Sequence, residues 1–266
     1  GLVTDYFPPE KQAALLGISS AMNQLGGVIA TLLAGISWRA SFLVYLLGLG
    51  SILLCLRFLP KGGIPRQAPT AQAADTPAPG GLRTFFVYVL AMFLLMSIFF
   101  LYPANFALET VSEGIIPQNY IAVIMAGMDF IAFCGGLLFV RAKMLLGGKT
   151  KFLAPLCFLI GYMLLALLGG WAGTLLGSIF VGFANGAGIP FIMSEASMKA
   201  GKAAATTVMP LISAALYLAQ FVSPMLMSVV TAIFGGTVAH LPYFFAIVLS
   251  VLFVLWSALI PSGKSE

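Results

Sequence analysis

Asp129 is a single carboxylate inside an apolar run, IMAGMDFIAF, which covers residues 124–133. In the middle of a membrane, an aspartate costs roughly 2.5 to 3.5 kcal/mol on insertion scales. A hydrogen bond there returns only about 0.6 kcal/mol on average. A carboxyl group can carry a proton or meet a cationic group of a solute. The alternatives are a salt bridge to a basic residue, or a protonated side chain bonded to a neighbouring helix.

Other polar side chains in apolar runs are the amides and phenols that could contact a bound solute. They are Asn23, Tyr102, Asn105, Asn185, Tyr217 and Gln220. A buried amide could equally well form a structural hydrogen bond between two helices. For the tyrosines, the ordinary alternative is an aromatic side chain that fills the interior. Both interpretations stay open for these residues.

Residues for covalent or metal chemistry are sparse. His240 is the only histidine, and neither an HExxH nor a GxSxG motif is present. The three cysteines, at 55, 134 and 157, lack the spacing of a zinc site and are expected to be small buried apolar residues. The sequence therefore predicts no catalytic residue, no metal site and no cofactor, and it argues against an enzyme.

The composition points to a membrane. Of the 266 residues, 61% are hydrophobic and 8% are charged, and the mean hydropathy is +1.06. In soluble domains about a quarter of the residues are charged. We therefore expect an integral membrane protein. The isoelectric point of about 9.2 does not indicate nucleic acid, because the cations lie in short loops and form no basic face.

A helix needs about 20 apolar residues to cross the hydrocarbon core. Segments of that length occur at 12–36, 40–59, 84–108, 119–140, 151–170, 172–194, 205–233 and 241–260. The fold class is therefore all-α and polytopic, with about eight transmembrane helices. Residues 60–83 are rich in Pro, Ala and Gly and predict a cytoplasmic linker. The linker separates two spans in 1–59 from six spans in 84–266.

The cations indicate the orientation. With eight spans, twelve of the thirteen Lys and Arg residues fall on one side, and only Arg39 falls on the other, with Glu109 and Glu113. This is the positive-inside pattern, so both ends of the chain are expected in the cytoplasm. The basic loop between spans four and five holds this topology and could also brace an inner gate through contacts to helix ends. Its cations are Arg141, Lys143, Lys149 and Lys151.

Small residues mark the packing faces. Ala122, Ala126, Asp129, Ala132 and Gly136 share one face of a helix, so Ile124, Met128 and Ile131 are expected to point toward lipid. The pair Gly182 and Gly186, four residues apart, predicts close helix packing. The span at 205–233 carries a polar stripe made of Ser213, Tyr217, Gln220, Pro224, Ser228 and Thr231.

Several segments resemble the major facilitator superfamily of transporters. SWRASFLVYLLG (37–48) resembles the outer turn between helices five and six, and FLPKGG (58–63) the exit into the central loop. GGLLFVRAKMLLGGKTKF (135–152) resembles the second copy of the family's signature loop. VGFANGAGIPF (181–191) resembles the glycine-rich tenth helix. The order of these segments implies helices five to twelve of a twelve-helix protein, without the first four.

The resemblance implies a secondary transporter that moves a small organic solute by alternating access, with coupling to protons as one option. Asp129 is then the candidate coupling residue, and the amides and tyrosines named above line the substrate cavity. The expected partners are a small-molecule substrate, membrane lipid and the four absent helices, in a bacterial plasma membrane. A scaffold or receptor-like membrane protein that transports nothing is the alternative, ahead of a membrane-embedded enzyme.

Overall fold

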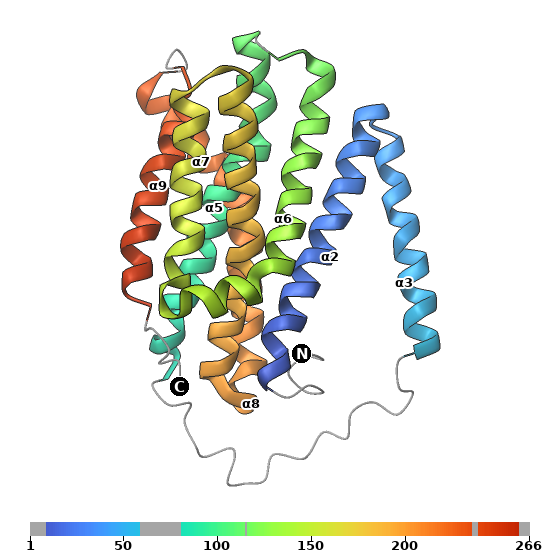
Figure 1. Ribbon diagram of the computed structural model, residues 1–266, viewed down its shortest axis with the longest axis vertical. Helices are drawn as coiled ribbons and strands as arrows, with labels where there is room; N and C mark the ends of the chain where they lie inside the picture. Colours follow the sequence, from blue (N-terminus) through green and yellow to red (C-terminus); the bar gives the residue numbers. More distant parts are fainter. Residues whose placement is uncertain (1–8, 59–80, 115, 236–238, 261–266) are drawn as a thin grey trace.

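The chain is described by a computed structural model that covers residues 9–58, 81–114, 116–235 and 239–260 (Figure 1). Within these ranges, helices are the only regular structure. The α-helices are α2 (Pro9–Ile36), α3 (Tyr45–Phe58), α5 (Gly81–Glu113), α6 (Gln118–Leu146), α7 (Leu153–Leu167), α8 (Gly170–Phe234) and α9 (Leu241–Ala258). Two short 3-10 segments, η1 (Ala40–Val44) and η2 (Gly147–Phe152), join them. The all-α prediction is confirmed for this part of the chain.

Seven helical segments in the described residues are long and apolar enough to cross a membrane. One of them, Gln118–Leu167, has 50 residues and contains two predicted spans. A straight helix of that length would measure about 75 Å, against a hydrocarbon core of about 30 Å. Figure 1 shows this segment reversing at its lower end, where η2 joins α6 to α7. The path of the chain therefore agrees with the predicted eight crossings.

The long helix α8 also folds back on itself. The hydroxyl group of Ser178 is hydrogen-bonded to Tyr102, and the hydroxyl group of Ser223 donates to the carbonyl oxygen of Ser97. Positions 178 and 223 would lie about 68 Å apart in a straight helix, yet both contact the same short stretch of α5. The two arms, Gly170–Ala200 and Thr207–Phe234, are therefore antiparallel, with the turn at the lower end of the molecule (Figure 1). They correspond to predicted spans six and seven.

Helix α5 lies at the centre of the bundle and packs against α8 and α9. Its carbonyl oxygens accept hydrogen bonds from other helices. Tyr162 donates from its hydroxyl group to Ile98 at 2.6 Å, and the indole nitrogen of Trp256 donates to Val87 at 3.0 Å. Pro103 lies inside α5 and does not end it. The helix continues for ten residues, to Glu113.

Glycines bring α6 and the first arm of α8 into backbone contact. A Cβ atom at Gly182 would overlap the carbonyl oxygen of Met128, and one at Gly186 would overlap that of Ala132. This confirms the packing prediction for the glycine pair. It also corrects the expected lipid face of α6, because Met128 and Ile124 are buried. The strongly exposed apolar residues of α6 lie at other positions, including Val123, Phe130, Leu137 and Leu138.

Helices α2 and α3 lie beside the other helices (Figure 1). Helix α2 packs mainly on α6 and also touches α8. Helix α3 has no buried residue and contacts η1. The predicted linker at 60–83 falls outside the described residues, except that Gly81–Arg83 already belong to α5. The division into two parts around this linker stays a prediction.

The glycine contact between α6 and α8 gives a test of the fold. We expect Gly186→Ala to lower the free energy of unfolding by about 1–3 kcal/mol, because the added methyl group meets a backbone carbonyl that cannot move alone. Gly127→Ala is the matched control, since nothing lies near its Cβ position. Thermal unfolding of both variants in the same detergent checks this expectation. Equal melting temperatures would contradict the observed packing.

Candidate functional site

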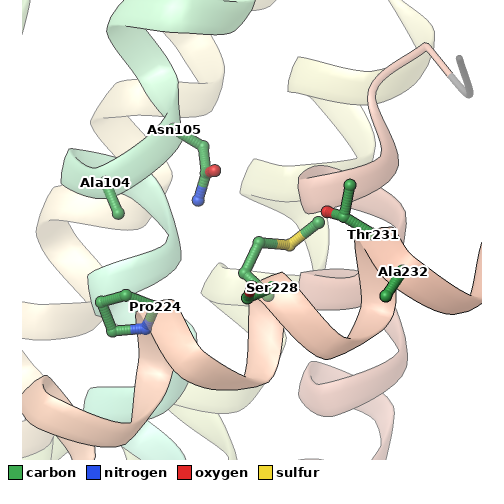
Figure 2. Close-up of a pocket in the computed structure, with 7 residues that line it drawn as sticks. Ala104, Asn105, Pro224, Ser228, Thr231 and Ala232 are labelled. Carbon is green, nitrogen blue, oxygen red and sulfur yellow. The ribbon is translucent and has the colours of Figure 1, made fainter. Parts of the chain in front are cut away.

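A hollow of about 500 Å³ lies between α5 and the second arm of α8 (Figure 2). Its residues follow helical spacing along the second arm, so that one face of this arm forms a wall. The lining residues are Ala104, Asn105, Pro224, Met227, Ser228, Thr231 and Ala232. We call this hollow the α5–α8 groove. Its lining contains one amide and two hydroxyl groups among apolar side chains, and none of the lining residues is charged.

Asn105 is held in place by its own helix. Its Nδ2 atom donates a hydrogen bond to the carbonyl oxygen of Leu101 at 2.9 Å. In Figure 2 the side chain points into the gap between the two helices, on the side where Ser228 and Thr231 lie. One amide hydrogen is thus used locally, while the carbonyl oxygen remains able to accept a hydrogen bond. Asn105 is the predicted cavity residue that the structure places in this groove.

Two other predicted cavity residues lie in the packed interior. Tyr102 is fully buried, stacks on Phe106 and is 2.6 Å from the hydroxyl oxygen of Ser178. Because Ser178 donates its own hydrogen to Thr174, Tyr102 is the donor in that contact. Asn185 is also fully buried, and neither atom of its amide has a hydrogen-bond partner in the described structure. Neither residue reaches the α5–α8 groove.

The remaining predicted cavity residues are exposed. Tyr217 and Gln220 lie on the second arm of α8, on the same face as Pro224 and Ser228. They extend the polar stripe from the groove toward the lower end of the molecule. Asn23 is exposed on α2, away from the residues that contact α6. Helical spacing therefore puts Tyr217 and Gln220 on the face of α8 that carries Pro224 and Ser228, outside the groove lining that contains Asn105, and Asn23 lies on another helix.

Asp129 lies where α6 meets α2, and it is partly buried. The hydroxyl group of Thr31 on α2 donates to its Oδ2 atom at 3.4 Å. A Cβ atom at Gly27 would lie 3.0 Å from the same oxygen, so this glycine leaves room for the carboxyl group. No Lys, Arg or His in the described residues lies within ion-pair distance of it. Asp129 therefore contacts a neighbouring helix as the acceptor of a hydrogen bond, and its role in coupling stays a prediction.

The basic loop does contact helix ends. Lys143 forms an ion pair with Glu195 on the first arm of α8 at 2.8 Å. Lys151 donates from its ammonium group to the carbonyl oxygen of Ala258, the last residue of α9, at 3.3 Å, and to that of Ile260, two residues beyond the helix, at 2.8 Å. Arg141 and Lys149 are exposed. Two of the four cations thus contact other helices or the chain just beyond them, and their role at a gate stays a prediction.

Sequence reasoning did not connect two groups of residues that the structure joins. Thr31 is the hydrogen-bond partner of Asp129. The sequence around Thr31 did not indicate that this part of α2 would lie next to Asp129. At the upper end, Glu109 and Glu113 meet His240. Their types and their common side of the membrane were visible, but the approach of α9 to the end of α5 was not.

A family model described as the Major Facilitator Superfamily matches residues 1–224. The chain belongs to this superfamily. The match runs from the N-terminal residues into the second arm of α8, so it includes Asp129, Asn105 and the beginning of the α5–α8 groove at Pro224. A search of curated proteins gave no match. This superfamily member is accordingly an integral membrane protein of a transporter family.

The room around Asp129 can be tested with two adjacent glycines. We expect Gly27→Val to be less stable than Gly26→Val by about 1–3 kcal/mol, because only the Gly27 side chain would displace the carboxyl group. Nothing lies near the Cβ position of Gly26. Both changes add the same β-branched residue to α2, so their cost to the helix itself is matched. Thermal unfolding curves with coincident midpoints would rule out the contact between α2 and Asp129.

Proposed function

We propose that this superfamily member moves a small organic solute across the membrane by alternating access, and that the α5–α8 groove binds the solute. The groove supports this proposal because it places polar groups from two helices around one open volume. Polar groups at membrane depth are costly unless they are paired or functional. The contacts would be made by Asn105, Ser228 and Thr231.

The absence of charge in the lining favours a neutral solute with hydroxyl, ether or amide groups. An amide and two hydroxyl groups offer both donors and acceptors but no counter-ion. An anion would lack a partner among the seven lining residues. A cationic solute would have to meet Asp129, which lies on a different helix pair. We therefore rank neutral solutes first and cationic solutes second.

Proton coupling through Asp129 is the second part of the proposal. The carboxylate accepts a hydrogen bond from Thr31. When the group is protonated, it can donate a hydrogen bond itself, and it loses its charge at an interface between α2 and α6. The two states therefore favour different contacts between these helices. A proton shifts a conformational equilibrium only when it binds the two conformations with different affinities, and different contacts between α2 and α6 would provide that difference.

The groove is tested by transport into proteoliposomes that contain the full-length protein. The solutes are a panel of radiolabelled sugars, polyols, amides and quaternary ammonium compounds. We expect Ser228→Leu to reduce uptake of the transported compound at least about tenfold, because a leucine fills the groove and removes a hydroxyl group. Val229→Leu, on the exposed apolar side of the same helix turn, is expected to transport normally. Full activity of Ser228→Leu would exclude the groove as the solute site.

The coupling role is tested with a pH gradient across the same vesicles. We expect Asp129→Asn to transport with a rate that no longer depends on the gradient, because the amide cannot bind a proton. Asp129→Glu keeps the carboxyl group and should retain part of the dependence. Gel filtration of both variants checks that they fold. If Asp129→Asn kept the dependence of the unchanged protein, the coupling role would be abandoned, whereas the groove proposal would stand.

A further inference from the structure

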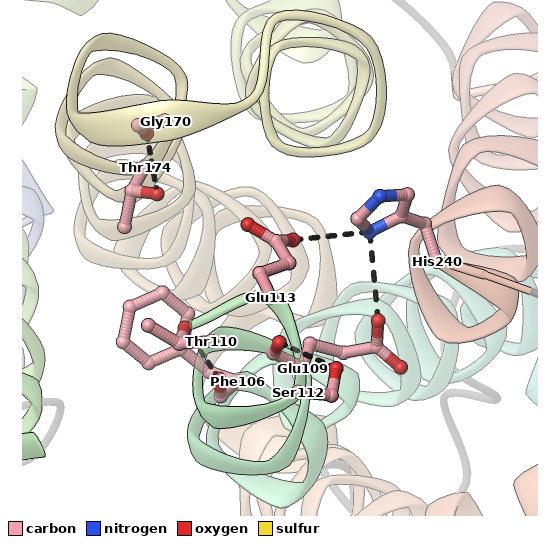
Figure 3. A network of polar contacts seen from close by, with 8 residues as sticks. All are labelled: Phe106, Glu109, Thr110, Ser112, Glu113, Gly170, Thr174 and His240. Atoms are coloured by element: carbon pink, nitrogen blue, oxygen red, sulfur yellow. Dashed lines mark hydrogen bonds and ion pairs between the residues drawn. The ribbon is translucent and has the colours of Figure 1, made fainter. Parts of the chain in front are cut away.

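Three ionisable side chains meet at the upper end of the molecule (Figure 3). Glu109 and Glu113 lie in the last turns of α5, and His240 comes directly before α9. The Nδ1 atom of His240 is 3.5 Å from the Oε2 atom of Glu109 and 3.2 Å from the Oε1 atom of Glu113. One imidazole therefore stands between two carboxylates that belong to another helix.

Protonation of the imidazole changes the balance of charge in this cluster. The two glutamates are four residues apart on α5, where like charges repel each other. A protonated imidazole attracts both of them, while a neutral imidazole leaves the repulsion uncompensated. Histidine is the side chain that ordinarily changes charge between about pH 5 and pH 8. The contact between α5 and α9 is therefore stronger at the acidic end of this range.

The backbone fixes His240 to the first turn of α9. Its carbonyl oxygen accepts hydrogen bonds from the backbone N–H groups of Tyr243 and Phe244, at 2.9 and 3.0 Å. Its φ angle is +57°, in the left-handed region. The imidazole also stacks on the ring of Tyr243, with the ring centroids 6.0 Å apart. Protonation of the side chain therefore acts on the start of α9 directly and not through a loose loop.

Few other groups compete for the proton. Tyr243 faces the imidazole, and Tyr162 of α7 lies behind it. Helix α7 has no charged residue, and the first arm of α8 has none before Glu195, near its lower end. Thr110 and Thr174 bond to carbonyl oxygens of their own helices. No group of three or more His, Cys, Asp and Glu side chains in the described residues is suited to a metal ion.

We propose that Glu109, Glu113 and His240 form a proton-sensitive latch that holds the start of α9 against the end of α5. The latch is closed when His240 is protonated and opens as the pH rises. Its side chains are 19% to 25% exposed, so protons reach them from the adjacent solution. The latch does not depend on the proposed function.

If the α5–α8 groove binds a solute, the latch also acts on it. Asn105 lies four residues before Glu109 on α5, which is one helical turn. Loosening the end of α5 would then change the position of Asn105 at the groove. This consequence rests on the proposed function, and the two experiments below test the latch without measuring transport.

The first experiment follows the imidazole itself. His240 is the only histidine in the 266 residues, so the chain labelled with [15N]histidine in nanodiscs gives one set of imidazole signals. We expect Glu109→Gln and Glu113→Gln each to weaken proton binding by His240 about fivefold, from the loss of one charge at about 4 Å in a watery environment. If the double variant titrates at the same pH as the unchanged chain, the carboxylates do not act on the imidazole and the latch is excluded.

The second experiment measures whether the proton holds the helix. Amide hydrogen exchange of residues 243–246 is compared at pH 6 and pH 8, after correction for the intrinsic effect of pH. We expect protection to fall several-fold at pH 8. His240→Asn should show this weaker protection at both pH 6 and pH 8, because asparagine adopts the left-handed backbone conformation but carries no charge. The start of α6, Gln118–Ile121, serves as an internal control at the same end.

Protection that changes equally with pH in the unchanged chain and in His240→Asn would overturn the latch. The single variant Glu113→Gln covers the case in which the double variant does not fold. It removes the shorter of the two contacts and leaves Glu109 in place. If its exchange pattern matched that of the unchanged chain at both pH values, the latch would be overturned as well.

Discussion

The hydrocarbon core of a membrane offers no hydrogen bonds, so each polar group that enters it must find a partner within the protein. Helices satisfy the backbone, and several hydroxyl side chains also find partners, although those of Ser20, Tyr88, Ser97 and Ser257 do not in the described structure. Thr110, Thr174, Ser178 and Ser250 each donate to a carbonyl oxygen one turn earlier in their own helix. Tyr162 and Trp256 donate to carbonyl oxygens of α5 instead. Polar side chains therefore hold the bundle together mainly through α5.

The same medium explains how α6 packs on two sides. Lipid tails are as apolar as leucine, so helices associate through close packing rather than through exclusion of water. Gly182 and Gly186 admit the backbone of α6 on one side, and Gly17 admits it on the other, where Gly27 leaves room for the side chain of Asp129. Asp129 lies in the second contact, where a larger residue at Gly27 would occupy its space. The costly carboxylate thus sits in the interface between α2 and α6, about two helical turns from the backbone contact between Gly17 and Gly136.

The sequence predicted the helices well and the contacts between them less well. Length and apolar composition are local properties, so the spans at 12–36, 172–194 and 241–260 agree with α2, the first arm of α8 and α9. The predicted lipid-facing side of α6 was partly wrong, because α6 packs on two sides and small residues occur on both of them. Met128, predicted to face lipid, is buried. Asn185 and Tyr102 resembled cavity residues but lie in the interior. Polarity alone does not separate a residue that lines a groove from one that is enclosed between helices.

The position of α5 has a mechanical consequence. Ser178 and Ser223 bind it from the two antiparallel arms of α8, through Tyr102 and Ser97, which are less than two turns apart. A tilt of α5 toward one arm therefore draws it away from the other. If α5 tilted as a rigid body, these two hydrogen bonds would lie near its pivot, with Glu109 and Glu113 at the upper end and Gly81 at the lower end. A displacement at one end of α5 would be transmitted to the opposite side of the membrane with its direction reversed.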